Sequence, residues 1–308
     1  MALWVVCVLV SLHPPVAYAS PACPIDFAVL KSSSANDHVW DEEGDHLKAF
    51  IAKMGWSFAD ITYDQINQGL LGMGENKKFC SIVLPGGYIS ARAQMISTVG
   101  RQHLRDFIRT GGGYIGFCAG AQHASCRLEI AYSAGRDNHL HQDFDYQPMT
   151  LPLLQLWDVT ARAPYDWAPF LDGETLESVR LTTNAPSLKK INLSSSITRM
   201  RYHGGPTFYF TQKPAGLEVW GRAMTPSHLR GGHFRATGQP TIVKFDYEAG
   251  RVILFSQHPV FSVDAESDTI NETLLLVALQ TMMDGASGAS CNAHLLSKIK
   301  VYQTTTNR

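Results

Sequence analysis

The chain has 308 residues, of which 45% are hydrophobic and 17% are charged, a composition that suits a globular protein with a sizeable core. Its formal net charge of −1, without a long basic run, argues against a nucleic-acid-binding protein. No stretch approaches the roughly 20 apolar residues of a membrane-spanning helix. We therefore expect neither a nucleic acid nor a membrane as a partner.

The N-terminus carries the pattern of a secretory signal peptide. An apolar block from Leu3 to Leu12 is followed by two prolines and by Ala17-Tyr18-Ala19, the small-x-small pattern that precedes cleavage. A buried N-terminal helix is the alternative, because no Lys or Arg precedes the apolar block. We expect residues 1–19 to be the signal peptide, 20–284 the domain and 285–308 a C-terminal tail, in a secreted protein.

Strand and helix patterns alternate through the first half of the chain, which predicts an α/β fold with a parallel sheet. Here we expect strands at 25–30, 56–61, 80–84 and 114–117, and helices at 42–54 and 91–110. After an irregular segment, 133–169, short strands are expected at 178–182, 198–202, 207–210, 217–220, 241–246 and 252–256, and a final helix at 267–283.

The stretch from Gly111 to Gln122 is typical of a nucleophile elbow, a strand–turn–helix that presents a catalytic nucleophile. Cys118 follows a short apolar run directly, and glycines stand two positions before and two after it, where the strained turn has room only for small residues. The turn places the sulfur at a helix N-terminus, which favours thiolate over thiol. We interpret Cys118 as a nucleophile; the alternative is a buried cysteine in a glycine-rich turn.

The remaining cysteines fit an oxidising compartment. Loss of the signal peptide leaves five, and an odd number requires a free thiol or an intermolecular bridge. Cys118 is the natural free thiol. Cys23 and Cys80 each precede an apolar run, and the starts of neighbouring parallel strands lie about 5 Å apart, within disulfide reach. We therefore expect the disulfide Cys23–Cys80 and, by elimination, Cys126–Cys291.

A second glycine-rich segment, Gly86-Gly87-Tyr88, follows the predicted strand 80–84 and Pro85. Glycines at this end of a strand let the backbone approach a ligand, and ligands of open parallel sheets bind at this edge. A simple tight turn is the alternative. We expect this segment to lie beside the elbow.

A thiolate nucleophile needs a base, and histidine suits that role near neutral pH. His258 is the best placed of the twelve histidines, because it ends a late strand and is followed by Pro259. His203 and His123 are its rivals.

Two sequons, at Asn192 and Asn271, are candidate glycosylation sites. His139, His141, Asp143 and Asp145 alternate as metal ligands on a strand could, but a solvated loop or strand edge fits them better. We expect no metal and no cofactor.

In their order along the chain, these blocks resemble class I glutamine amidotransferase-like proteins, and they are most similar to the N-terminal domain of fungal biotin–protein ligases. The resemblance rests on Leu84-Pro-Gly-Gly87, Gly113-Tyr-Ile-Gly-Phe-Cys-Ala-Gly120, Tyr202-His-Gly-Gly205, and Gly250-Arg-Val-Ile-Leu with His258-Pro259. It covers most of the chain, from residue 25 to about residue 283.

The resemblance implies a flavodoxin-like three-layer α/β sandwich with a mostly parallel central sheet. It implies Cys118 as nucleophile, His258 as base, and an oxyanion hole formed by the backbone N–H groups of Ala119 and of Gly86 or Gly87. Such donors stabilise the charge that develops in the transition state. The candidate substrate pocket is formed by Tyr88, Gln122, His203, Gly204 and Gly205.

One position departs from the family pattern. The family has a glutamate two residues after the histidine, which orients the ring and stabilises the imidazolium. Val260 stands there in this chain and can do neither. The motif supplies no substitute, although four acids lie in segments that could reach the histidine: Asp37, Asp41, Asp264 and Glu266.

These observations lead to three hypotheses. The first is a secreted cysteine hydrolase that attacks a small-molecule or peptide amide through a Cys118 thioester. The second is a binding module that keeps the scaffold but has lost turnover, and the third is a redox-sensing thiol at Cys118. We expect neither biotin ligation nor amido transfer, because 308 residues hold no ligase or synthase domain beside this one.

Overall fold

The structure is a computed structural model, and it describes residues 23–34, 36–132, 145–164, 175–189, 191, 193, 195–224, 227–229, 232–234 and 237–287. The expected signal peptide, Asn192, Cys291 and the alternating residues from 139 to 143 lie outside these ranges, as does the expected C-terminal tail apart from residues 285–287, which are helical. Within them, no helix is both long enough and apolar enough to cross a membrane.

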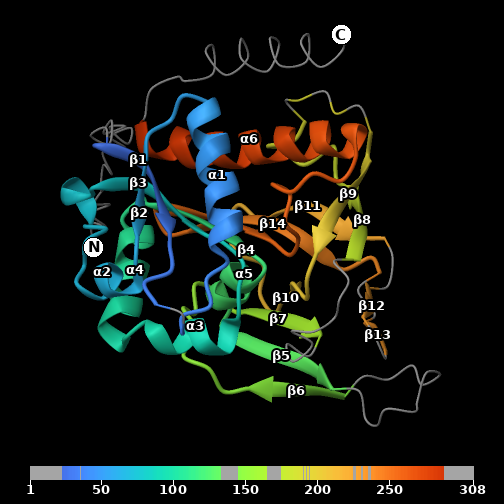
Figure 1. Cartoon of the computed structure of the whole chain (residues 1–308), viewed down its shortest axis with the longest axis horizontal. Coiled ribbons are helices and arrows are strands. Elements are labelled where there is room, and N and C mark those ends of the chain that lie inside the picture. The colour runs from blue at the N-terminus through green and yellow to red at the C-terminus, as the bar shows by residue number, and fades with distance from the viewer. Residues whose placement is uncertain are drawn as a thin grey trace, which may run out of the picture.

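A large mixed sheet forms the centre of the described structure, with its strands in the order β2-β1-β3-β4-β15-β14-β11-β8-β9 (Figure 1). Neighbouring strands from β2 to β15 are parallel, and those from β15 to β9 are antiparallel. The strands are β1 (Ile25–Leu30), β2 (Phe58–Ile61), β3 (Phe79–Leu84), β4 (Gly113–Phe117), β8 (Thr175–Leu181), β9 (Ile197–Tyr202), β11 (Glu218–Ala223), β14 (Pro240–Tyr247) and β15 (Gly250–Phe255).

Helices cover both faces of this sheet, so the predicted three-layer α/β fold is confirmed. Alternate residues of each strand point to opposite faces. Phe27 and Val29 of β1 pack with α1 (Asp41–Lys53) and α6 (Ala265–Ser287). Ala28 and Leu30 pack on the other face, which is covered by α2 (Tyr63–Asn67) and α4 (Thr98–Arg109). The continuous apolar burial of both faces explains why the parallel strands are apolar runs without alternation.

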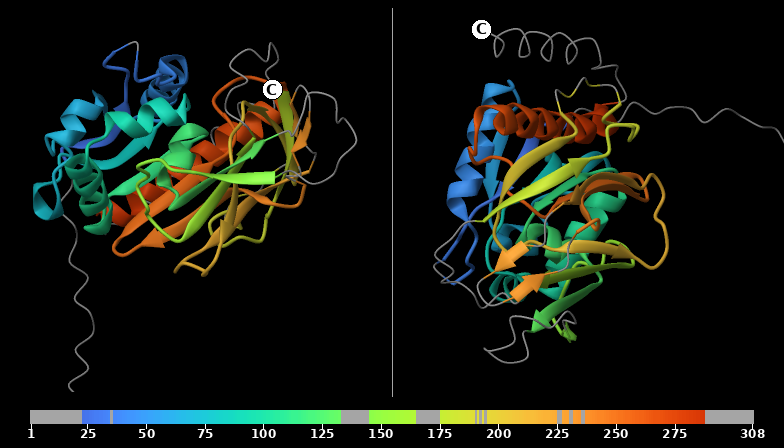
Figure 2. Two further views of the ribbon diagram at one scale, coloured as in Figure 1. Left: turned by 90° about the horizontal axis from the view of Figure 1, so that it is seen from below. Right: turned by 90° about the vertical axis from the view of Figure 1, so that its right-hand side faces the viewer.

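A smaller sheet, β10-β7-β5-β6, occupies much of the segment that the sequence left irregular. It lies on the opposite side of the main sheet from α6 (Figures 1 and 2), and it packs on α3 (Ile89–Met95) and α5 (Ala119–Ala124). Its strands, all short, are β5 (Arg127–Tyr132), β6 (Asp145–Met149), β7 (Val159–Pro164) and β10 (Thr207–Phe210). A separate hairpin is formed by β12 (Ser227–Leu229) and β13 (Gly232–Phe234).

The single helix expected at 91–110 is wrong, because two helices occupy that stretch. α3 ends at Met95, and Ser97 caps α4 by accepting a hydrogen bond from the N–H of Gly100. Serine is among the best N-cap residues, and this cap starts a new helix in a new direction. The break matters for the site, because it frees α3 to lie beside the glycine-rich loop after β3.

The predicted disulfide between Cys23 and Cys80 is confirmed. β1 and β3 are parallel neighbours, and their pairing brings the two Cα atoms to 5.3 Å. Cys126 forms no disulfide with any described cysteine, and its thiol lies 3.3 Å from Oδ1 of Asp158. The second bridge, to Cys291, stays a prediction.

Replacing both Cys23 and Cys80 by serine should lower the free energy of unfolding. The bridge spans 57 residues, and in the chain-entropy model a loop of that length stabilises the folded state by about 4 kcal/mol. Urea unfolding of the double variant and of the wild type measures the difference. An unchanged free energy of unfolding would contradict the prediction.

Candidate active site

Cys118 lies in the predicted strand–turn–helix between β4 and α5. Its backbone angles are φ 47° and ψ −108°, a conformation that non-glycine residues rarely adopt and that strains the turn. The N–H of Cys118 donates to the carbonyl of Phe255 in β15, at 2.8 Å, and its carbonyl accepts from the N–H of Gln122, at 2.9 Å. The turn is therefore fixed on one side by the sheet and on the other by the helix.

The two glycines that flank the elbow are required by close packing. A Cβ added to Gly116 would lie 2.7 Å from the backbone of Gly120, and one added to Gly120 would lie 2.2 Å from the carbonyl oxygen of Leu84. Real Cβ atoms do not approach backbone so closely. The contact with Leu84 also joins the elbow to the end of β3.

His258 lies three residues after the end of β15 and is fully buried. Its N–H donates to the carbonyl of Arg201 at 2.9 Å, and its ring lies edge-on to Trp40 with 4.8 Å between the ring centroids. Ring atom Nδ1 lies 2.8 Å from Oε1 of Glu43, whereas Nε2 is buried without a hydrogen-bond partner among the described residues. The Glu43 contact assigns the Nδ1 proton, which leaves Nε2 as the ring nitrogen that is able to exchange a proton with a reacting group.

Burial alone would lower the pKa of His258, but the charge of Glu43 and the nearby thiol of Cys118 raise it to about 10. The imidazole is therefore a cation at neutral pH. A protonated histidine beside a cysteine is the arrangement that stabilises a thiolate. The thiol itself is 5% exposed, and its Sγ lies 3.5 Å from the carbonyl oxygen of His203.

Glu43 supplies the acid that the motif lacks at Val260. It stands in the first turn of α1 and is fully buried, and its two carboxylate oxygens have different partners. Oε1 accepts from the His258 ring, and Oε2 accepts from the backbone N–H of Gly86. Glu43 was not among the acids expected from the sequence. The missed signal is its helical position, because Glu43 shares a buried stripe with Leu47, Phe50 and Ile51.

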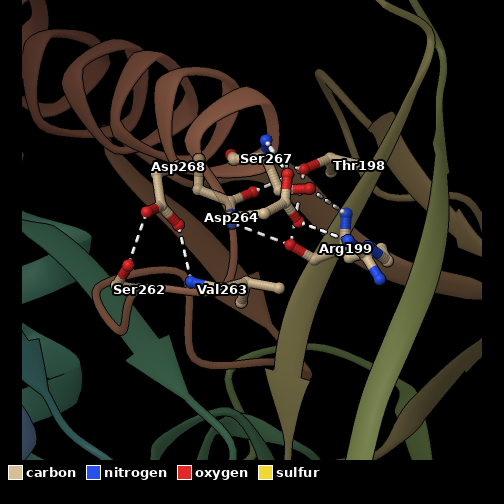
Figure 3. Close-up of polar contacts among 8 residues, drawn as sticks. Thr198, Arg199, Ser262, Val263, Asp264, Ser267 and Asp268 are labelled. Atoms are coloured by element: carbon tan, nitrogen blue, oxygen red, sulfur yellow. Dashed lines mark hydrogen bonds and ion pairs between the residues drawn. The ribbon is translucent and has the colours of Figure 1, made fainter.

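The two candidate acids near α6, Asp264 and Glu266, do not bind His258. Figure 3 shows that Asp264 caps the helix: Oδ1 accepts from the N–H of Ser267 at 3.0 Å, and Oδ2 pairs with Arg199 at 2.8 Å. The hydrogen bonds from Ser267, and then Arg199, lower the pKa of Asp264. Asp268 binds Val263 and Ser262 in the same turn, and Glu266 is exposed. Neither Asp264 nor Glu266 bonds to His258.

The two candidate aspartates after β1 stabilise the loop that leads into α1. Asp37 is buried and accepts hydrogen bonds from the Ser32 hydroxyl at 2.7 Å and from the N–H of Ser33 at 2.6 Å. Burial raises its pKa, but these bonds outweigh burial and lower it. Asp41 accepts from the N–H of Ser32 at 2.9 Å. They position the start of α1, and hence Glu43, without touching His258.

The expected oxyanion donors need one correction. The N–H of Gly86 is bonded to Glu43, so it is not free to bind an oxyanion. The N–H of Gly87 donates to no described residue, and Ala119 stands at the first position of α5, where helix N–H groups lack an intrahelical acceptor. Gly87 and Ala119 are therefore the available pair.

The expected pocket residues come from three segments, of which residues 203–205 contact Cys118 through the carbonyl of His203. Gln122 is buried and donates from its amide to the carbonyl of Gly204 at 3.3 Å, while His203 contributes its carbonyl to Cys118. Gly205 packs tightly, since a Cβ there would lie 1.8 Å from the carbonyl oxygen of Ser256. Tyr88 is half-buried in the loop after β3.

The rival histidines are less suited to the role of base. His123 is fully buried with neither ring nitrogen hydrogen-bonded among the described residues, and burial, with Arg92 and Arg101, lowers its pKa to about 3. His203 has an exposed side chain and brings its carbonyl to the cysteine. No group of three or more His, Cys, Asp or Glu that could hold a metal ion occurs among the residues described.

The expected glycosylation at Asn271 is wrong for the folded protein. Asn271 is 1% exposed, its amide donates to the carbonyl of Arg199 at 2.9 Å, and its oxygen accepts from Thr198 at 2.8 Å. A glycan needs a surface position. The side chain instead forms a buried polar contact between α6 and β9.

The fold and the site together define an α/β protein with a cysteine at a nucleophile elbow and a histidine–glutamate pair behind it. The chain belongs to the family of biotin–protein ligase N-terminal domains, whose model matches residues 68–300. Cys118 and His258 lie inside the matched segment, and Glu43 lies before it. No curated protein matches the chain.

Solved structures share its overall arrangement at low identity. A putative ThuA-like protein from Bacteroides uniformis is 13% identical, with a TM-score of 0.48 over 88% of this chain and 95% of that one. A β-galactosidase from Bacillus circulans sp. alkalophilus is 10% identical, with a TM-score of 0.47 over 85% of this chain. The present chain spans 32% of that enzyme.

Gly120→Ala should destabilise the protein because the new Cβ cannot avoid the carbonyl of Leu84. Overpacking of this kind costs about 1–3 kcal/mol. Gly44→Ala is the matched control, because Gly44 is also helical but its added Cβ makes only ordinary contacts, the nearest at 3.6 Å. That variant should be neutral or gain up to about 1 kcal/mol from helix propensity. Urea unfolding that ranks the two variants in the opposite order would contradict the packing argument.

The His258–Glu43 pair should make stability depend on pH. The pKa of His258 rises from 6.5 to about 10 on folding, so between these values the folded state holds a proton that the unfolded state lacks. The stabilisation is complete below pH 6.5 and is lost as pH rises toward 10, with a slope of at most about 1.4 kcal/mol per pH unit.

Unfolding at a series of pH values measures this slope in the wild type and in Glu43→Gln. The variant removes the charge that raises the pKa of His258, and its slope should be shallower. Other groups titrate equally in both proteins, so the difference isolates the pair. Identical slopes would show that Glu43 does not hold the proton on His258.

Proposed function

We propose that the protein is a cysteine-dependent hydrolase that acts on amide or related carbonyl substrates through a Cys118 thioester. The observation that carries this proposal is the buried hydrogen bond between His258 and Glu43 beside the cysteine. A purely structural cysteine would not need a fully buried, charged imidazole with a dedicated carboxylate, because burying two charges is costly.

The reaction would proceed in two steps. The Cys118 thiolate attacks the substrate carbonyl carbon, and the resulting oxyanion accepts hydrogen bonds from the N–H groups of Gly87 and Ala119. His258 donates its Nε2 proton to the leaving group as the carbon–nitrogen bond breaks, which leaves a thioester. His258 then takes a proton from water, the hydroxide attacks the thioester, and Cys118 leaves as a thiolate.

The substrate would be a small molecule or a peptide amide. Secretion is part of the proposal, supported by the signal-peptide pattern and by the Cys23–Cys80 disulfide, since disulfides persist in oxidising compartments. Glycosylation at Asn192 stays a prediction. Biotin ligation and amido transfer are not proposed, because the family match covers an N-terminal domain alone.

A catalytically silent binding module is the alternative on the same scaffold. The low exposure of Cys118 and the contact of its Sγ with the carbonyl of His203 favour this alternative. It predicts that a ligand binds Cys118→Ala as well as the wild type and that no acyl group forms on the sulfur.

Cys118→Ala and Glu43→Gln test the hydrolase with p-nitrophenyl acetate as an acylating probe. The wild type should release a burst of p-nitrophenol and carry an acetyl group on Cys118, detected by peptide mass spectrometry. Cys118→Ala should abolish both. Glu43→Gln should slow acylation by up to roughly 10⁴-fold, the cost of losing the orienting acid in a serine triad.

Glu42→Gln is the matched control, because Glu42 is the exposed neighbour of Glu43 and undergoes the same substitution. Its burst should equal that of the wild type. A burst that survives in Cys118→Ala would refute the proposed nucleophile. Absence of any burst in the wild type would favour the binding module.

A further inference from the structure

Arg92 is a fully buried cation that has no acidic partner among the described residues. It stands in α3, and no carboxylate of the described residues lies within ion-pair distance of its guanidinium. One of its nitrogens, Nη2, is buried without any hydrogen-bond partner among them. Burying an unpaired charge lowers the stability of the folded protein. We therefore expect a functional reason for the position of Arg92.

The guanidinium binds the glycine-rich loop after β3. Nη1 donates to the carbonyl oxygens of Pro85 and Gly86, the latter at 2.9 Å, and Nε donates to the hydroxyl of Tyr63 at 2.9 Å. The carbonyl of Gly86 also accepts from the N–H of Trp40 at 3.0 Å. All of these acceptors are neutral, and two of them belong to the loop that carries the proposed oxyanion donor.

Holding the carbonyl of Gly86 also aims the next N–H. In a trans peptide the C=O of one residue and the N–H of the following residue point in opposite directions, and the described residues contain no cis peptide bond. Because Arg92 and Trp40 hold the carbonyl of Gly86 on one side, the N–H of Gly87 points to the other. That N–H donates to no described residue.

The Gly86–Gly87 peptide needs such a restraint. Gly87 has φ +143°, a region open to glycine alone, and a peptide between two glycines can rotate with little steric resistance. On the other side of Gly86, the preceding peptide is fixed by Glu43, and a Cβ on Gly86 would lie 2.6 Å from the His258 ring. The Pro85–Gly86 peptide is therefore held at its N–H by Glu43 and at its carbonyl by Arg92, whereas the carbonyl of the Gly86–Gly87 peptide is held by Arg92 and the N–H of Trp40.

We propose that Arg92 is a positioning residue that fixes the Gly86–Gly87 peptide and so directs the N–H of Gly87 into the oxyanion hole. The proposal rests on the proposed hydrolase function, since an oxyanion hole matters only where a carbonyl is attacked. Without Arg92, the Gly86–Gly87 peptide can rotate so that the carbonyl of Gly86 points into the oxyanion hole. The hole would then hold a carbonyl oxygen, which repels an oxyanion, in place of the N–H of Gly87. Loss of one oxyanion-hole donor typically lowers the rate by about 10²–10³-fold.

Two reagents separate this role from a general loss of the site. p-Nitrophenyl acetate acylates Cys118 by addition to a carbonyl and needs the oxyanion hole. Iodoacetamide alkylates the same sulfur by direct displacement at carbon, forms no oxyanion, and reports the thiolate alone. Peptide mass spectrometry reads each reaction at Cys118.

Arg92→Met should slow acylation of Cys118 by about 10²-fold or more, and leave the rate and pH profile of alkylation unchanged. Arg92→Lys and Tyr63→Phe are milder: the first keeps the cation and the second removes the hydroxyl that binds Nε. Both should slow acylation by a smaller factor than Arg92→Met and leave alkylation unchanged. They provide the test if Arg92→Met does not fold. Arg101→Met is the matched control, because Arg101 also donates to a backbone carbonyl, that of Ile96, outside the loop.

Equal losses of acylation and alkylation in the Arg92 variants would overturn the proposal, because they would show a collapsed site. Unchanged acylation in those that fold would overturn it as well. Failure of the proposed function has a different signature: the wild type itself would show no acylation that depends on Cys118, while alkylation of Cys118 would proceed.

Discussion

The carboxylate of Glu43 joins three parts of the chain that are distant in sequence: the first turn of α1, the loop after β3, and His258 in the segment after β15. Both of its oxygens are used, one by His258 and one by the N–H of Gly86, and all of these groups are buried. A buried carboxylate is stable only when it is paired and hydrogen-bonded. Glu43 therefore determines three features of the site: the positive charge of the His258 imidazole, the orientation of its ring, and the conformation of the glycine-rich loop after β3.

The parallel half of the main sheet explains how these parts meet. β1, β3, β4 and β15 are parallel neighbours, so the segments after their C-terminal ends converge at one edge, where open α/β sheets bind ligands. The elbow follows β4, His258 follows β15, and the glycine loop follows β3. α3 lies beside that loop and brings a second buried charge, Arg92, to its carbonyl groups. The two charges act on opposite sides of Gly86.

The sequence was sufficient for the features that have local signals. The apolar runs predicted the parallel strands, the Gly-x-Cys-x-Gly spacing predicted the elbow, and the strand starts predicted the disulfide. Glu43 was missed because its contact with His258 spans 215 residues and replaces an acid that the family places at position 260. The prediction of glycosylation at Asn271 was wrong because a sequon carries no information on whether its asparagine is buried. Of the small sheet, β10 was expected, whereas β5, β6 and β7 were missed; β6 and β7 are short and carry few large apolar residues.

The most direct test of the account is an NMR titration of the His258 ring in the wild-type protein. The account predicts an imidazolium that persists through neutral pH, with its Nδ1 proton in the hydrogen bond to Glu43, and that loses its proton only as the pH approaches the pKa of about 10. A ring that is neutral at pH 7, titrating at or below the ordinary pKa of 6.5, would contradict the charged pair on which the proposed chemistry rests.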